Sequence, residues 1–182
     1  MGLDMYLNAE IYVSSYKPED EPLRSDLIAR TGIIPAEHHG LTVSAPVIYW
    51  RKANAIHNWF VQNVQDGTDD CKDYYVSRED LEKLRDLCRE VLAGLKTETG
   101  KVHVGTTHGP GGVVTENYEE GRVVTNPEFA EERLPATRGF FFGCTDYDEH
   151  YLQDLQHTAD EIDRVLNCPA LQGAGFEYHS SW

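Results

Sequence analysis

Hydrophobic and polar residues alternate strictly at the start of the chain, where residues 3–13 are apolar at every second position. This period of two is typical of a β-strand with one buried face. Residues 42–49 predict a second strand, and Pro46 within it favours a sheet edge or a bulge, because proline cannot donate a ladder hydrogen bond. A final strand is predicted over residues 175–179.

Three longer stretches have the period of an α-helix instead. They predict the main helices, over residues 51–65, 77–96 and 146–167. Ser77 begins the second with a capping pair, and we expect Thr145 to cap the third, ahead of an acidic first turn that the helix dipole favours.

Short elements are predicted between these helices. A helix over residues 24–30 would end before Gly32, and another would begin at Asn126-Pro127. Residues 101–125 predict two or three strands with a hairpin turn at 119–121. The apolar run 138–144 predicts a central strand that is buried on both faces.

The order of these elements predicts an α+β fold, in which a mostly antiparallel sheet packs against three main helices. The length of 182 residues favours one domain. No apolar run approaches the roughly 20 residues of a membrane helix. The N-terminus has no basic region, so we do not expect a signal peptide.

The chain is strongly acidic, with 31 Asp and Glu against 16 Lys and Arg and a net charge of −15. This charge argues against direct nucleic-acid binding, which depends on Lys and Arg contacts to phosphate. The four cysteines have no close metal-binding spacing and predict reduced thiols in a cytoplasmic protein. The eight histidines also lack a metal-ligand spacing, so we expect neither a metal nor a cofactor.

A polar and aromatic cluster over residues 49–60 is the densest concentration of candidate chemistry. Arg51 and Lys52 stand at the start of a predicted helix, where anions bind well. Trp50, Asn54 and His57 would share one face of that helix. These residues form either a ligand or partner site, or a core in which tryptophans are buried and the two bases pair with acids.

A glycine-rich stretch over residues 105–112 includes His108, the last candidate for this site. It lacks the sequence of a P-loop or of a dinucleotide-binding turn. It is interpreted as a hairpin loop, with a ligand-binding loop as the alternative.

Acidic residues are spread over several segments, and a compact scaffold that displays them could imitate the phosphates of a nucleic acid. The alternative is that they only keep the protein soluble. For the acids at 146–149, helix capping and the favourable helix dipole are a sufficient explanation. The candidates for an acidic partner surface are Asp69, Asp70, Asp73, Glu119, Glu120, Asp146, Asp148 and Glu149.

Several segments together resemble a family of small phage and prophage proteins, most of them uncharacterised. The block YWRKANAIHNWF at 49–60 is the most specific of them. The others are the opening MGLDMYL, residues 69–71 with 74–79, and the FFFG motif at 140–143 with 147–148. The resemblance supplies no catalytic residues, so an enzymatic role is not expected from it.

Small acidic phage proteins include inhibitors of host defence. The resemblance therefore implies an anti-CRISPR-like inhibitor that engages the basic nucleic-acid channel of a host effector, with a Cas9–guide complex as the candidate partner. One alternative is a small-molecule or nucleotide-binding protein or hydrolase with a pocket around Arg51, Lys52 and His57. A second alternative is a structural or assembly protein of the virion.

Overall fold

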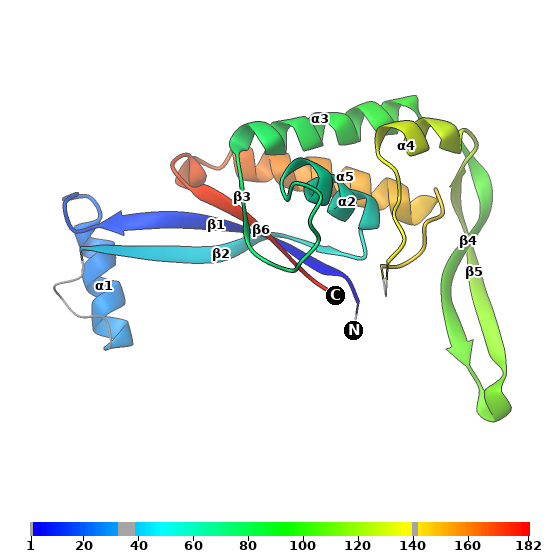
Figure 1. The fold of residues 1–182 in the computed structure, drawn as a ribbon, viewed down its shortest axis with the longest axis horizontal. Coiled ribbons are helices and arrows are strands. Elements are labelled where there is room, and N and C mark those ends of the chain that lie inside the picture. Colours follow the sequence, from blue (N-terminus) through cyan, green and yellow to red (C-terminus); the bar gives the residue numbers. More distant parts are fainter. Residues whose placement is uncertain (1, 33–38, 140–141) are drawn as a thin grey trace.

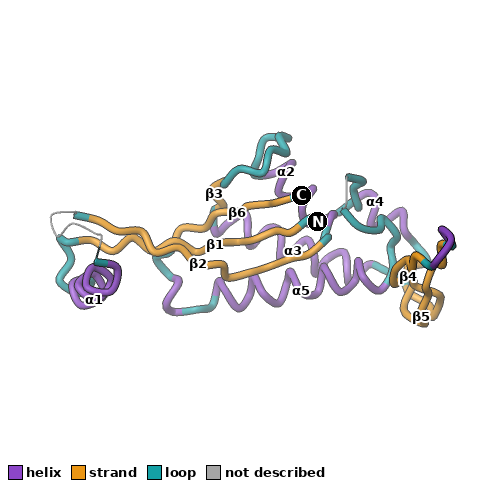
Figure 2. Tube along the Cα trace, turned by 90° about the horizontal axis from the view of Figure 1, so that it is seen from below, coloured by secondary structure: helices purple, strands orange, loops and turns teal. Residues whose placement is uncertain are grey.

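An antiparallel sheet of four strands forms the base of the fold in the computed structural model, which describes residues 2–32, 39–139 and 142–182. The strand order is β2-β1-β6-β3, and Figure 2 shows the four strands side by side in this order. The strands are β1 (Asp4–Ser14), β2 (Gly40–Arg51), β3 (Tyr74–Val76) and β6 (Gly175–Ser181).

Helices cover one face of this sheet (Figure 1). The main ones are α2 (Asn54–Asn63), α3 (Arg78–Gly94) and α5 (Glu149–Leu166). The short helix α4 (Pro127–Arg133) packs beside α3. The alternation in β1 explains this packing, because Leu3, Met5 and Leu7 all point into the core and are fully buried. The apolar faces of α3 and α5 complete the core with Leu84 and Leu155, which are also fully buried.

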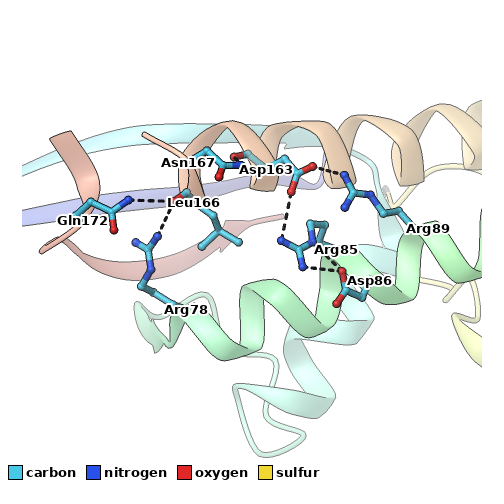
Figure 3. Close-up of polar contacts among 8 residues, drawn as sticks. All are labelled: Arg78, Arg85, Asp86, Arg89, Asp163, Leu166, Asn167 and Gln172. Carbon is cyan, nitrogen blue, oxygen red and sulfur yellow. Dashed lines mark hydrogen bonds and ion pairs between the residues drawn. The ribbon is translucent and has the colours of Figure 1, made fainter. Parts of the chain in front are cut away.

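Polar contacts fix α3 against α5 (Figure 3). Arg85 and Arg89 of α3 both pair with Asp163 of α5. At the end of α5, Arg78 donates hydrogen bonds to the backbone oxygen of Leu166 at 2.7 Å and to that of Leu171 at 3.2 Å. Arg78 thus satisfies the Leu166 carbonyl, which the end of α5 leaves without a partner, and also binds the 3₁₀ turn that follows.

Two projections extend from this body (Figure 1). At one end, β1 and β2 run on past the core to α1 (Glu21–Thr31). At the other end, β4 (Thr97–His108) and β5 (Val114–Val124) form a hairpin. Short 3₁₀ turns lie at Pro110–Gly112 and Pro169–Leu171.

The base of the hairpin is held to α5 by one ion pair. Arg122 of β5 binds Glu149 through two side-chain hydrogen bonds of 2.8 Å each. These bonds to the charged carboxylate lower the pKa of Glu149 to about 2. The pair thereby fixes where the hairpin leaves the body, which matters for the site below.

Most predicted elements are confirmed, and the fold is α+β as expected. The capping pair of α3 forms, since Ser77 accepts a hydrogen bond from the backbone of Asp80. Pro46 lies both on an edge strand and next to a bulge in the β1–β2 pairing. Among the described residues, no helix is both long and apolar enough to cross a membrane.

The start of the first main helix was predicted too early. Residues 50–51 belong to β2, and Lys52 has a left-handed backbone with φ of 59°. The Lys52 amide donates to the Leu3 carbonyl at 2.8 Å, so it continues the sheet pairing instead of starting a helix. Trp50 therefore does not share a helix face with Asn54.

The hairpin turn was also misplaced. Gly121 lies within β5, directly opposite Gly100 of β4. The chain turns instead in the glycine-rich stretch, where Gly111 and Gly112 have positive φ values of 78° and 80°. That stretch is a hairpin loop, as its main interpretation predicted.

The predicted central strand at 138–144 is wrong for the described residues, and positions 140–141 lie outside them. Gly143 has φ of 91°, which no strand uses, and a side-chain amide binds the carbonyls of Phe142 and Cys144 in place of a neighbouring strand. The last main helix begins after this segment, at Glu149, and Asp148 caps it instead of Thr145.

Candidate functional site

A cavity of about 630 Å³ opens where β2 ends. Its walls are the β2–α2 junction, residues 103–106 in the outer half of β4, Ala136 with residues 143–148, and the first turns of α5. Small-molecule sites usually measure about 300–1,000 Å³, so the cavity is of a size for a metabolite.

Lys52 lines this cavity in a strained conformation. A positive φ at a residue other than glycine costs on the order of 1–3 kcal/mol, and such strain concentrates at functional sites. Gly143 packs against it, and a Cβ atom at that position would lie 3.1 Å from Lys52 Cβ. Lys52 is exposed, and within the described residues it has no ion-pair partner. Its charge is therefore available to a ligand.

Arg51 lies beside Lys52 and lines the same cavity. Its side chain is 59% exposed, and its Nη1 atom is 3.6 Å from Asp4 Oδ1. At this distance the pair is loose and solvent-screened, so Asp4 leaves most of the guanidinium's donors unused. Of the described residues that line the cavity, these two neighbours are the only Lys or Arg side chains.

Asn54 holds one wall of the cavity in place. Its side-chain amide donates to the backbone oxygens of Phe142 at 3.3 Å and Cys144 at 2.8 Å, and accepts from the amide of Thr137 at 3.0 Å. All three partners are main-chain groups of residues that lie outside the helices and strands. Asn54 is thus a structural residue of the site rather than a free donor.

Asp154 of α5 is another residue that lines the cavity. Burial, with a contribution from the charge of Asp148, raises the pKa of Asp154 to about 7. No described side chain or backbone group donates a hydrogen bond to its carboxyl group. A carboxyl group that is near half protonation can both donate and accept hydrogen bonds at neutral pH.

His57 and Trp50 lie in the core instead of the cavity. His57 is 1% exposed, and its ring nitrogens contact the Tyr178 hydroxyl at 2.7 Å and Asp69 Oδ2 at 3.0 Å. Trp50 donates from Nε1 to Thr158 at 2.9 Å. The structure therefore brings Arg51, Lys52 and Asn54 together but separates them from His57 and Trp50, and His108 is not a lining residue.

The acidic candidates are dispersed and serve different contacts. Two of them line the cavity, two lie on the exposed part of β5, and four bind neighbouring side chains. Asp146 and Asp148 line the cavity, and Glu119 and Glu120 lie on β5. Asp69 binds His57 and Trp182, and Asp70 binds Lys72 and Tyr74. Asp73 pairs with His179, and Glu149 pairs with Arg122.

Sequence reasoning missed Asp154. A signal was present, because this acid falls between Tyr151 and Thr158 on the stripe of α5 that faces the core. His103 and His150 also line the cavity. No signal in the sequence indicates that both lie there, because this depends on where the hairpin leaves the body. Within the described residues no three His, Cys, Asp or Glu side chains converge so as to hold a metal ion.

Comparisons with family models, with curated proteins and with solved structures find no match for this chain. The functional assignment therefore rests on the geometry of the site.

The raised pKa of Asp154 predicts how stability varies with pH. The folded protein holds this proton more tightly than the unfolded chain, whose carboxyl titrates near 3.8. The contribution is therefore present at low pH and is lost as the pH rises through about 4 to about 7. Asp154→Asn removes this loss, so we expect it to be more stable than the wild type at pH 8, by on the order of 2 kcal/mol. Urea unfolding at several pH values measures the difference, and a wild-type Asp154 that titrates near 4 in carboxyl NMR would contradict it.

Proposed function

We propose that this protein binds a small phosphorylated or nucleotide-type metabolite in the cavity at the end of β2. The observation that carries the proposal is the exposed and strained Lys52, which has no ion pair within the described residues and lies beside Arg51 on the cavity wall. Lysine and arginine are the side chains that bind phosphate best, one as a compact charge and the other as a planar fork.

The rest of the lining limits the ligand to molecules that also carry hydrogen-bond donors. Asp146, Asp148 and Asp154 line the same cavity as the two cations, so its field is mixed in sign. A long polyanion such as nucleic acid would be repelled there. A mononucleotide or a sugar phosphate satisfies both sides, because its phosphate can meet Lys52 while its hydroxyl or amino groups meet Asp154.

Lys52→Asn tests this proposal. Asparagine tolerates the left-handed conformation, so the variant loses the charge while the backbone keeps its shape. Loss of a charged hydrogen bond weakens binding roughly tenfold to a hundredfold. Thermal-shift screening against a panel of nucleotides and sugar phosphates identifies a ligand, and calorimetry then compares the variants.

Lys17→Asn is the matched control, since Lys17 is exposed in the loop between β1 and α1. That loop lies at the end of the molecule opposite the hairpin (Figure 1). We expect it to bind like the wild type. A panel in which no compound stabilises the wild type, or an equal loss in both variants, would contradict the proposal.

A second candidate function is the acidic inhibitor that the resemblance implies. The projecting hairpin favours it, because residues 111–120 are all exposed and include Glu116, Glu119 and Glu120. A narrow acidic projection fits a channel lined with Lys and Arg better than a flat surface does, and opposite charges accelerate its approach.

Binding to a Cas9–guide complex across a salt series tests this second function. We expect affinity that falls steeply with salt and is reduced several-fold by Glu119→Gln with Glu120→Gln. Glu131→Gln with Glu132→Gln on α4 is a control of equal charge, because both acids are exposed there. Absence of binding at low salt, or an equal effect of both double variants, would exclude the hairpin as the inhibitory element.

A further inference from the structure

The face of the sheet that points away from the helices is not covered by any described element (Figure 1). The strand alternation that buries Leu3, Met5 and Leu7 sends the intervening residues to this open face. The register fixes which of them meet across the strands. Tyr6 of β1 pairs with Tyr49 of β2 on one side and with His179 of β6 on the other.

These three residues form an aromatic row across the sheet. The ring centroids of Tyr6 and Tyr49 are 5.2 Å apart, and those of Tyr6 and His179 are 6.4 Å apart. Tyr75 of β3 lies on the same face, opposite Glu177, and is 70% exposed, while Tyr49 is 44% exposed. Exposed rings in this number on one side of a sheet are typical of recognition surfaces.

Carboxylates outnumber cations around the aromatic row. Arg51 lies on this face beside Tyr49, and its charge is offset there by Asp4. Glu10 and Glu177 lie on the open face, and within the described residues neither has an ion-pair partner. Burial, together with the nearby charges of Glu10 and Asp73, raises the pKa of Glu177. The negative charges on this face therefore repel one another, and an added cation would relieve that repulsion.

We propose that the open face of the sheet binds an arginine-rich segment of a partner protein, with guanidinium groups stacked on Tyr49 and Tyr75 and paired with Glu10 and Glu177. Charge complementarity selects a cationic partner over a nucleic acid, whose phosphates these acids would repel. The exposed rings select arginine over lysine, because a guanidinium stacks on aromatic faces and also forks onto a carboxylate. The side chains that this proposal uses line neither the cavity nor the hairpin, so its test does not depend on either.

An oligo-arginine peptide is the probe, and its binding is measured by fluorescence anisotropy with a labelled peptide. We expect the wild type to bind it more tightly than an oligo-lysine peptide of equal length. Tyr49→Ser with Tyr75→Ser should weaken oligo-arginine binding roughly fivefold to twentyfold, from the loss of two cation–π contacts. Both rings are exposed, so circular dichroism should show an unchanged fold.

Two control variants separate local recognition from overall charge. Tyr118→Ser removes a ring that is 51% exposed on the hairpin, and Glu82→Gln removes an exposed acid on α3. We expect both to bind oligo-arginine like the wild type, and Glu177→Gln to bind it several-fold more weakly.

Equal effects of Glu82→Gln and Glu177→Gln would overturn the proposal, because binding would then reflect only the net charge. Equal affinity for the two peptides would also overturn it. Binding of a single-stranded oligonucleotide would overturn the proposal as well. The same holds for self-association in ultracentrifugation, if the tyrosine double variant abolishes it. Those two results would assign the face to nucleic acid or to a second copy of this chain.

Discussion

The candidate site depends on the three hydrogen bonds that the Asn54 amide makes to the main chain of residues 137–144. Thr137, Phe142 and Cys144 lie outside the strands, so their main-chain groups need another source of hydrogen bonds. Asn54 provides one from the first turn of α2 and thereby brings Gly143 against Lys52. Without this contact, the strained Lys52 backbone would lose the neighbour that fixes its position, and the cavity would lose a wall.

The one-sided packing of the sheet determines where the other surfaces lie. Because α2, α3 and α5 cover a single face, the tyrosines of the opposite face remain exposed, and the cavity forms at the end of the sheet where β2 passes into α2. Arg51 belongs to both regions, since it lines the cavity and also pairs with Asp4 across the sheet. The two proposed sites are thus neighbours that use different side chains, and a partner on the sheet could reach the rim of the cavity.

Local pattern was enough to predict the elements whose signals are contained in a short stretch, such as the alternation in β1 and the capping pair at Ser77. It failed where a distant contact overrides the local signal. The apolar run at 138–144 resembles a strand, but the Asn54 amide, more than 80 residues away, binds its carbonyls. For the site, Arg51, Lys52 and Asn54 were predictable, whereas the burial of His57 and the role of Asp154 follow only from how α2 and α5 pack.

The most direct test of this account is the binding of Asn54→Asp to both classes of probe. The substitution turns the donor that faces two carbonyl oxygens into a carboxylate oxygen, which repels them. The account predicts that the variant loses affinity for the nucleotide or sugar phosphate found with the wild type, yet binds oligo-arginine unchanged, because the sheet does not depend on residues 137–144. Undiminished affinity for the metabolite would contradict the claim that Asn54 builds the ligand site.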